Sequence, residues 1–237
     1  MKKKRKIVVT GGEGRFGSVL KKSKFNFNML FPKKNELNIT KYKSVKKYIY
    51  KTKPQYVIHL AGLSRPMSLH EKDISKSIEL NIVGTANVVL ACALYNIKLI
   101  YFSTSYVYPG TKGNYKETDA LLPSNNYAWS KMGGESAVQM YKNSLIIRAS
   151  MTEKPFVHKR AYTNVLTNFI YHDDFIKIFK KIIHLKGVIN LGGPTRSVYN
   201  FAKKSNPKIK KIFLKKNKKY LMPINSSMNL KKLKKYL

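Results

Sequence analysis

The chain has 237 residues, enough to bury one substantial hydrophobic core with a small appended lobe. Hydrophobic residues make up 43% of the sequence and aromatic residues 12%, which excludes an intrinsically disordered chain. The single cysteine, Cys92, excludes an internal disulfide, so we expect a reducing, cytoplasmic environment.

The charge balance is strongly basic, with 47 Lys and Arg against 11 Asp and Glu, a formal net charge of +36. Such a balance is found in nucleic-acid-binding proteins. Here the lysines are spread through every segment, together with many Asn and Ile residues. We interpret this pattern as a general compositional bias, which disfavours nucleic acid as a partner. Attraction of an anionic substrate stays open as an alternative.

The N-terminus resembles the basic start of a signal peptide, because Lys2–Lys6 are all basic. The apolar run that follows, Ile7–Val9, is much shorter than the roughly 7–15 residues of a secretory core. We therefore expect no signal peptide. We also expect no segment of about 18 uncharged residues to span a bilayer, and no membrane partner.

Short apolar runs alternate with helix-period segments along the chain. The runs lack clean polar alternation, as expected for strands covered on both faces. The predicted strands are Lys6–Thr10, Asn26–Phe31, Tyr56–Leu60, Leu99–Ser103, Ser144–Arg148 and Val188–Leu191. The predicted helices are Gly14–Lys22, Lys41–Lys51, Ile74–Tyr95, Asn125–Tyr141 and Asp173–Leu185. This alternation predicts an α/β fold with a doubly wound parallel sheet.

Two stretches, 151–168 and 193–237, contain prolines and no clear period. We predict that they form one small substrate-binding lobe, while 1–150 and 169–192 form the doubly wound domain. Helical fragments are expected at Val198–Lys204 and Ser227–Tyr236, the second with Ser226 or Ser227 as its N-cap.

A glycine-rich turn follows the first strand, in the pattern Gly12-x-Gly14-x-x-Gly17, and Gly11 allows a shifted register. Glycine lets the chain turn sharply and lets a pyrophosphate approach the backbone, while the N-terminus of the next helix favours phosphate. The sequence therefore predicts a Rossmann dinucleotide site, with cofactor contacts from Gly11, Gly12, Glu13, Gly14, Arg15, Phe16 and Gly17.

Further cofactor contacts are predicted at the ends of neighbouring elements. Ala61 and Gly62 end the third strand, where small residues permit close approach of a ligand. Asn81 lies on the long helix and faces either the cofactor or a neighbouring helix. Beyond the second strand, Lys33-Lys34 favour the 2′-phosphate of NADP, and Glu36 keeps NAD open.

Tyr127 and Lys131 are spaced by one helical turn, which places them on one face of a helix. An unperturbed tyrosine has a pKa of about 10, so a phenol that transfers protons near neutral pH needs a cation beside it. Thr104 follows the fourth strand and would hold the substrate oxygen. We predict that Thr104, Tyr127 and Lys131 are catalytic, with Lys131 also binding the nicotinamide ribose.

These motifs resemble those of the extended short-chain dehydrogenase/reductases. The segments Phe102–Gly113, Tyr115–Glu117 and Tyr127–Lys131 are similar to those of dTDP-4-dehydrorhamnose reductases, and Tyr171–Asp174 and Ile189–Gly193 also resemble parts of that family. The resemblance implies an NAD(P)H-dependent oxidoreductase that reduces the 4-keto group of a nucleotide-linked 4-keto-6-deoxysugar, in dTDP-rhamnose and polysaccharide biosynthesis. It implies catalytic roles for Thr104, Tyr127 and Lys131.

Two departures from related enzymes narrow the reaction. Sugar 4,6-dehydratases carry an Asp-Glu pair after the catalytic threonine, where this chain has Ser105 and Tyr106. Epimerase-reductases carry a cysteine at the place of Tyr106, whereas Cys92 reads as a buried helix residue. We therefore expect reduction without dehydration or epimerisation.

Predicted substrate contacts are Arg65, Thr104, Ser105, Tyr127 and Arg148. Arg65 could clamp a diphosphate or form a surface ion pair. The segment His158–Arg160 could meet phosphate or face water. No metal site is expected, because Asp173 and Asp174 at a helix start are explained by capping.

Two matters of assembly stay open. The resembled family includes a non-catalytic NADP-binding regulatory subunit, that of methionine adenosyltransferase, which is the alternative to the enzyme. A homodimer is also open, and the sequence identifies neither the nucleotide nor the sugar.

Overall fold

The computed structural model describes residues 5–215 and 222–237. The chain divides into two compact units. The first unit comprises residues 1–103, 130–147 and 183–188, and the second comprises 104–129, 148–182 and 189–237. These boundaries differ from those of the predicted lobes, because 104–129 and most of 169–192 group with the second unit.

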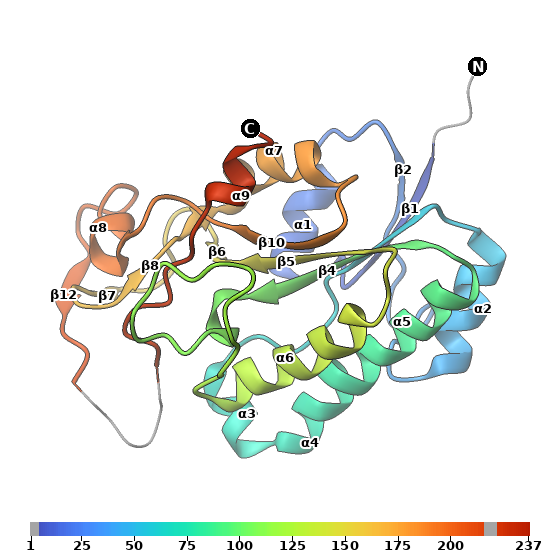
Figure 1. Cartoon of the computed structure of the whole chain (residues 1–237), viewed down its shortest axis with the longest axis horizontal. Helices are drawn as coiled ribbons and strands as arrows, with labels where there is room; N and C mark the ends of the chain where they lie inside the picture. Colours follow the sequence, from blue (N-terminus) through green and yellow to red (C-terminus); the bar gives the residue numbers. More distant parts are fainter. Residues whose placement is uncertain (1–4, 216–221) are drawn as a thin grey trace. The chain divides into compact units, whose positions relative to one another are not determined.

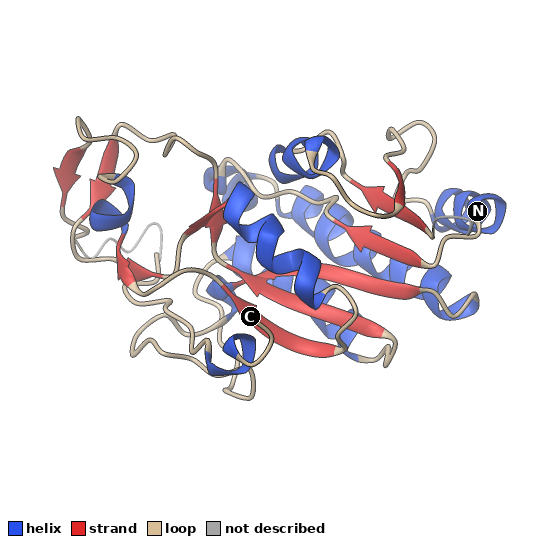
Figure 2. Ribbon diagram, turned by 90° about the horizontal axis from the view of Figure 1, so that it is seen from above, coloured by secondary structure: helices blue, strands red, loops and turns tan. Residues whose placement is uncertain are grey.

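A six-stranded parallel sheet, in the order β10-β5-β4-β3-β1-β2, confirms the predicted fold class (Figures 1 and 2). Its strands are β1 (Lys6–Thr10), β2 (Asn28–Leu30), β3 (Tyr56–His59), β4 (Lys98–Thr104), β5 (Ser144–Ala149) and β10 (Gly187–Leu191). β1 lies between β2 and β3, with Val8 opposite Val57 in register. The apolar runs form central strands because both faces are covered, and Ile7, Val8 and Val9 are completely buried.

Helices cover both faces of this sheet. Helix α1 (Arg15–Lys22) lies on one face, whereas α2 (Tyr42–Thr52) and α5 (Gly84–Leu94) lie on the other (Figure 1). Helix α6 (Asn126–Gln139) runs beside α5 on this second face (Figures 1 and 2). The core between these helices and the sheet joins Ile49 of α2, Val88 of α5 and Val138 of α6.

The segment predicted as one long helix contains three helical pieces. α4 (Ile74–Ser77) is followed by a π-helix, η1 (Ile78–Val83), and then by α5; the short α3 (Met67–Lys72), which precedes them, was not predicted. Contrary to expectation, the run Ile74–Leu94, with a mean hydropathy of 1.6 over its best window, is long and apolar enough to cross a membrane. It packs against α2, and Val88, Ala91 and Cys92 are buried, as in the core helix of a globular domain.

The second unit is built from short elements. They are the 3₁₀ turn η2 (Ser105–Val107), β6 (Met151–Thr152), β7 (Arg160–Tyr162), β8 (Leu166–Thr167), β9 (Ile170–Tyr171), α7 (His172–Ile182), β11 (Arg196–Ser197), α8 (Val198–Ala202), β12 (Lys210–Ile212) and α9 (Lys231–Lys234). Strands pair as β6 with β9, β7 with β12 and β8 with β11. Phe156, Val198 and Phe201 lie in its small apolar core.

One predicted helix start in the second unit is wrong. α9 begins after Leu230, three residues beyond the predicted cap at Ser226 or Ser227. The Ser227 hydroxyl instead donates a hydrogen bond to Asn225 Oδ1 (2.7 Å) and accepts one from the Asn114 N–H (3.0 Å). Ser227 therefore fastens a loop, which is a tertiary role that helix-capping patterns do not reveal.

Candidate cofactor and active site

The strand order reverses between β1 and β3, because α1 carries the chain to β2 on one side and α2 returns it to β3 on the other. In doubly wound sheets, ligands bind beyond the carboxyl ends of the strands at such a reversal. By this rule we expect the ligand crevice of the first unit where β1 and β3 end, at Thr10 and His59.

The predicted glycine turn lies at this point and leaves no room for a side chain at Gly11 or Gly17. The Gly14 N–H donates to the Gly11 carbonyl oxygen (3.0 Å). Gly11 has φ +69°, and a Cβ there would lie 2.5 Å from the Ala61 nitrogen. A Cβ at Gly17 would lie 2.6 Å from the Gly11 oxygen. Gly11 and Gly17 thus close the turn, and Ala61 forms its floor.

The start of α1 fits a dinucleotide pyrophosphate. No side chain caps the helix at Gly14, and the first turn contains no acidic residue. The backbone N–H groups of a helix's first turn and the positive end of its dipole favour an anion here. Arg15 in this turn donates from Nη2 to Ser64 Oγ (2.8 Å), and Phe16 is buried against Phe102, with ring centroids 5.3 Å apart.

The other residues of the turn are differently exposed. Glu13 is exposed, and Gly12 lies against Phe31, whose Cδ1 would be 2.6 Å from a Cβ at Gly12. Beyond β2, the Glu36 carboxylate accepts a hydrogen bond from the Lys33 N–H (2.8 Å). Glu36 is therefore used to shape its own loop, while the Lys33-Lys34 side chains are exposed.

Asn81, in η1, holds the loop that follows β3. Its Oδ1 accepts from the Leu63 N–H (2.7 Å), and its Nδ2 donates to the Leu63 carbonyl oxygen (2.9 Å) and to Ser130 Oγ (2.8 Å). A Cβ at Gly62 would lie 2.6 Å from Asn81 Oδ1. Asn81 thus packs against a neighbouring helix and a loop, and its cofactor contact stays a prediction. Arg65, next in this loop, is exposed.

Thr10, His59 and Thr85 form a buried network of polar side chains that leads to Asn81. The sequence analysis did not single out this network. Thr10 Oγ1 is 2.7 Å from His59 Nδ1, and His59 Nε2 is 3.1 Å from Thr85 Oγ1. The Thr85 hydroxyl donates to the Asn81 carbonyl oxygen (2.8 Å). Burial, with a smaller contribution from Lys131, lowers the pKa of His59 to about 3. His59 is therefore neutral and joins the crevice strands to η1.

Lys131 lies on α6, one turn after Tyr127. Burial lowers the pKa of its amine to about 7, against an opposing effect of Glu135. Its Nζ lies 4.2 Å from the centroid of the Tyr101 ring, and the Tyr101 hydroxyl donates to the Lys131 carbonyl oxygen (3.0 Å). The ammonium is thus held over an aromatic face at a pKa near neutrality, which is typical of functional lysines.

Two further features of α6 were missed by the sequence analysis. Glu135 is buried and accepts a short hydrogen bond from the Ser103 hydroxyl. Gly134 brings the helix against η1 and β4, because a Cβ there would lie 2.3 Å from the Asn81 oxygen and 2.8 Å from Tyr101 Oη. The adjacent glycines 133 and 134 inside a helical pattern were the signal for this close approach.

The remaining predicted reacting residues belong to the second unit. Thr104 ends β4 and is buried, and its Oγ1 accepts from the Tyr106 N–H (3.3 Å). Ser105 is buried in the 3₁₀ turn that follows. The Tyr127 ring packs edge-on against Tyr106, with centroids 6.3 Å apart, and is partly exposed. Thr104 and Tyr127 are thus linked through the 3₁₀ turn.

Arg148 is buried rather than presented at a surface. Its Nη1 donates to Tyr108 Oη (2.8 Å) and to the Glu117 carbonyl oxygen (3.0 Å), and its guanidinium lies over the Tyr108 ring. The Tyr108 hydroxyl donates in turn to Asn190 Oδ1 (2.8 Å). These contacts stabilise the second unit, and substrate contact by Arg148 stays a prediction.

The remaining candidates lie away from these residues or are buried. His158, Lys159 and Arg160 are exposed, and a phosphate contact there also stays a prediction. Asp173 and Asp174 lie in the first turn of α7, as expected for residues at a helix start. Cys92 is completely buried, as predicted, and burial raises the pKa of its thiol, which leaves it unreactive.

Comparisons with known proteins place this geometry in a family. A family model described as the RmlD substrate binding domain matches residues 5–179. The methionine adenosyltransferase 2 subunit beta of Bos taurus is 31% identical over 143 residues, 56% of this chain and 42% of that protein. The dTDP-4-dehydrorhamnose reductase of Aggregatibacter actinomycetemcomitans is 27% identical over 202 residues, 81% of this chain and 63% of that protein.

The fold also matches a solved structure. The dTDP-4-dehydrorhamnose reductase of Bacillus anthracis, in complex with NADP, superposes with a TM-score of 0.87 at 24% identity, covering 99% of this chain and 92% of that one. The chain spans less than two thirds of the length of both curated relatives named above. Since the family model matches well over half of the sequence, the chain belongs to the RmlD substrate-binding-domain family.

Proposed function

We propose that the protein is an NADPH-dependent reductase acting on the 4-keto group of a nucleotide-linked 4-keto-6-deoxysugar. The glycine turn and the uncapped start of α1 support a dinucleotide cofactor. Membership in the RmlD family and the reductase relative support the substrate class. The excess of basic over acidic residues, a net charge of +36, favours an anionic substrate.

The observation that carries the proposal is the amine of Lys131. It lies one helical turn after Tyr127, and its pKa of about 7 places its charge change in the range where an enzyme works. The protonated amine lowers the pKa of a phenol beside it, so that the phenol can donate or accept a proton near neutral pH. Its position over Tyr101 fixes the amine in place.

The chemistry follows from these residues. A bound reduced nicotinamide supplies the hydride that the carbonyl carbon needs. Tyr127 gives its phenolic proton to the resulting alkoxide oxygen, Thr104 donates a hydrogen bond to the same oxygen, and Lys131 stabilises the phenolate that is left. Ser105 and Tyr106 provide no carboxylate pair, so the site lacks the acid and base that elimination of water requires.

NADP is the preferred cofactor in this proposal. Glu36, which could have bound a ribose diol, already accepts the Lys33 N–H. The exposed Lys33-Lys34 side chains could then pair with a 2′-phosphate. The single thiol, that of the buried Cys92, fits an enzyme of the reducing cytoplasm.

The test is to mix the protein with NADPH and a dTDP-4-keto-6-deoxysugar and to follow the absorbance of the reduced nicotinamide. Tyr127→Phe should lower kcat by about 10²–10⁴-fold, the usual contribution of a general acid, and leave the NADPH affinity unchanged. Tyr50→Phe, at an exposed tyrosine of α2, is the matched control and should keep full activity. Turnover by Tyr127→Phe at the rate of the unmodified protein would refute the proposed role.

A second function is favoured by one specific observation. The beta subunit of methionine adenosyltransferase 2 is 31% identical to this chain over 143 residues, about as similar as the dTDP-4-dehydrorhamnose reductase of Burkholderia thailandensis, which is 32% identical over 137 residues. Under this alternative the protein binds NADP and associates with a catalytic partner. Tyr127→Phe separates the two functions, because a binding subunit keeps its partner affinity when the phenol is removed.

A further inference from the structure

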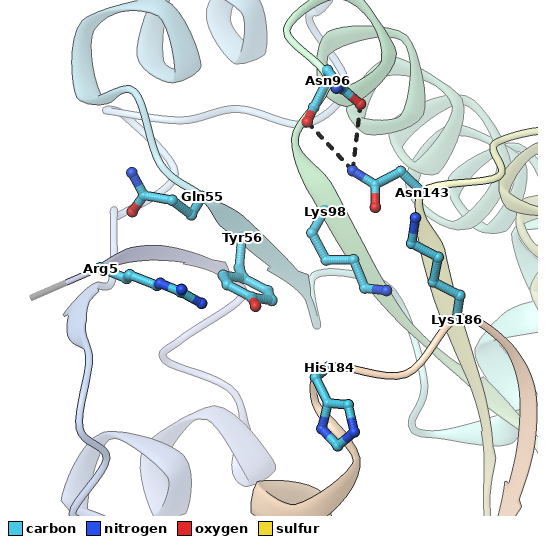
Figure 3. A pocket seen from close by; sticks show the side chains of 8 residues that line it. All are labelled: Arg5, Gln55, Tyr56, Asn96, Lys98, Asn143, His184 and Lys186. Carbon is cyan, nitrogen blue, oxygen red and sulfur yellow. Dashed lines mark hydrogen bonds between the residues drawn. The ribbon is translucent and has the colours of Figure 1, made fainter.

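A small pocket lies at the amino edge of the first unit's sheet, the edge opposite the glycine turn. Its volume is about 260 Å³, and its lining residues, shown in Figure 3, are Arg5, Gln55, Tyr56, Asn96, Lys98, Asn143, His184 and Lys186. Each of them starts a strand or lies just before or near one: Arg5 precedes β1, Tyr56 starts β3 and Lys98 starts β4. The sheet topology therefore gathers side chains from five separate stretches of chain.

The lining is basic. Arg5, Lys98, His184 and Lys186 come from three of these stretches, and the other four lining residues are uncharged. Among the described residues, no carboxylate lines the pocket. Figure 3 shows the Lys98 side chain between Tyr56 and Lys186, with His184 below it. This arrangement concentrates positive potential in one hollow.

Lys98 is the buried cation of this group, with only 7% of its surface exposed. Its Nζ donates to the Leu185 carbonyl oxygen (2.5 Å), which satisfies one of the three donors of an ammonium. Burial and the nearby charge of Lys186 lower the pKa of the amine to about 8. A buried cation beside a second cation is costly unless an anion approaches it.

The uncharged walls are held in place by their own hydrogen bonds and ring contacts. Gln55 Oε1 accepts from the Lys6 N–H (2.6 Å), and Asn143 Nδ2 donates to the Asn96 carbonyl oxygen (3.3 Å). The Tyr56 ring packs edge-on against Phe27, with centroids 5.8 Å apart. These contacts fix the walls before any ligand binds, which lowers the entropic cost of binding.

We propose that this amino-edge pocket binds a phosphate dianion, held by Lys98, Lys186, Arg5 and His184. Its volume lies below the roughly 300–1,000 Å³ of pockets for drug-sized ligands, so it suits a compact anion rather than a nucleotide. The phosphate comes either as the free ion or as the end group of a small phosphomonoester. This site is separate from the cofactor crevice and does not depend on the proposed function.

The experiment is isothermal titration calorimetry with inorganic phosphate, at an ionic strength held constant with sodium chloride. The unmodified protein should bind one phosphate in a saturable manner. Lys98→Met should weaken the affinity about tenfold or more, equivalent to about 1.4 kcal/mol. The control is Lys46→Met, at an exposed lysine of α2, which removes the same charge and should change the affinity less than twofold.

A second variant, which keeps the buried Lys98, distinguishes loss of the phosphate site from misfolding of Lys98→Met. Lys186→Gln keeps Lys98 and should weaken phosphate binding by a smaller but measurable factor of about three. Equal losses in Lys98→Met, Lys186→Gln and Lys46→Met would show that phosphate is attracted only by the overall charge, and would overturn the site. Absence of saturable binding to the unmodified protein would overturn it as well.

Two further arms sharpen the result. Glycerol phosphate competes with the free ion, and whichever binds more tightly identifies the source of the anion. At about pH 8.5, titrations in two buffers of different ionisation enthalpy should reveal proton uptake, because a bound anion raises the pKa of Lys98. Arg5, Tyr56, His184 and Lys186 are the other titratable groups facing the pocket, and loss of the uptake in Lys98→Met assigns it to this amine.

Discussion

The two edges of the first unit's sheet collect positive potential in different ways. At the carboxyl edge the glycine turn offers backbone N–H groups and the start of α1, with glycine where side chains would intrude. At the amino edge the potential comes from side chains, chiefly Lys98 and Lys186. A site built from backbone leaves a local pattern in the sequence. A site built from side chains exists only after the fold has assembled them.

The two lysines whose pKa values are lowered, Lys131 and Lys98, show the same contrast. Lys131, near the carboxyl edge, has the carboxylate of Glu135 close by, which raises the pKa against the effect of burial. Lys98, at the amino edge, has Lys186 close by, which lowers the pKa further. The protein itself supplies a negative charge near the Lys131 amine, whereas the Lys98 amine needs a bound anion to balance its charge.

The largest expected effect comes from filling the glycine turn. Gly14 has an extended conformation that any residue adopts, and a Cβ there would meet only the Gly11 carbonyl oxygen, at 3.2 Å. A larger side chain at this position would lie at the start of α1, where we propose that the pyrophosphate binds. Gly14→Val should weaken NADPH binding about 100-fold or more, equivalent to about 2.7 kcal/mol, as measured by fluorescence titration. Phosphate affinity at the amino edge should be unchanged. Loss of both affinities together would mean that the substitution unfolds the first unit.

The next effect concerns the packing of α6 against η1 and β4 at Gly134. Gly134→Ala places a methyl group 2.3 Å from the Asn81 oxygen, so the helix must shift. We expect a loss of about 1–3 kcal/mol in the free energy of unfolding, measured by urea denaturation. Ser136→Ala, at an exposed position of the same helix, should change it by less than about 0.5 kcal/mol. Equal effects of the two substitutions would contradict the close contact.

A smaller effect is expected for cofactor choice. Replacing both Lys33 and Lys34 by Gln should lower the affinity for NADPH about five- to tenfold and leave that for NADH nearly unchanged, since only NADPH carries the 2′-phosphate. The measurement is the ratio of the two dissociation constants. A parallel loss for both cofactors would indicate a general effect of charge rather than recognition of the 2′-phosphate.

The last prediction concerns the pH dependence of stability. The pKa of Lys98 is about 8 in the folded protein and close to 10.5 when unfolded, so the unfolded state binds more protons between these values. The free energy of unfolding should therefore rise with pH in this window, by at most about 1.4 kcal/mol per pH unit from this group. In phosphate-free buffer, Lys98→Met should be more stable than the unmodified protein at pH 7, and this advantage should vanish near pH 11.

The sequence predicted the sheet strands to within two residues at each end because buried parallel strands are apolar runs, as in β1 and β5. The glycine turn and the one-turn spacing of Tyr127 and Lys131 could also be predicted, because each is a pattern of residues close together in the sequence. The two-residue strands β6 and β9 were missed, since their pairing depends on tertiary contacts. The Ser227 cap was wrong and the amino-edge pocket was unseen, because both depend on residues far apart in the chain.

The neutral histidine beneath the crevice has a practical consequence. His59 keeps the same protonation state at every pH near neutrality, because its pKa is about 3, yet its ring is close enough to feel the charge of Lys131. Its nitrogen resonances in an NMR titration should therefore move only when the lysine changes charge. The His59 ring thus becomes a built-in probe of the charge of Lys131, the lysine that we propose to act in catalysis.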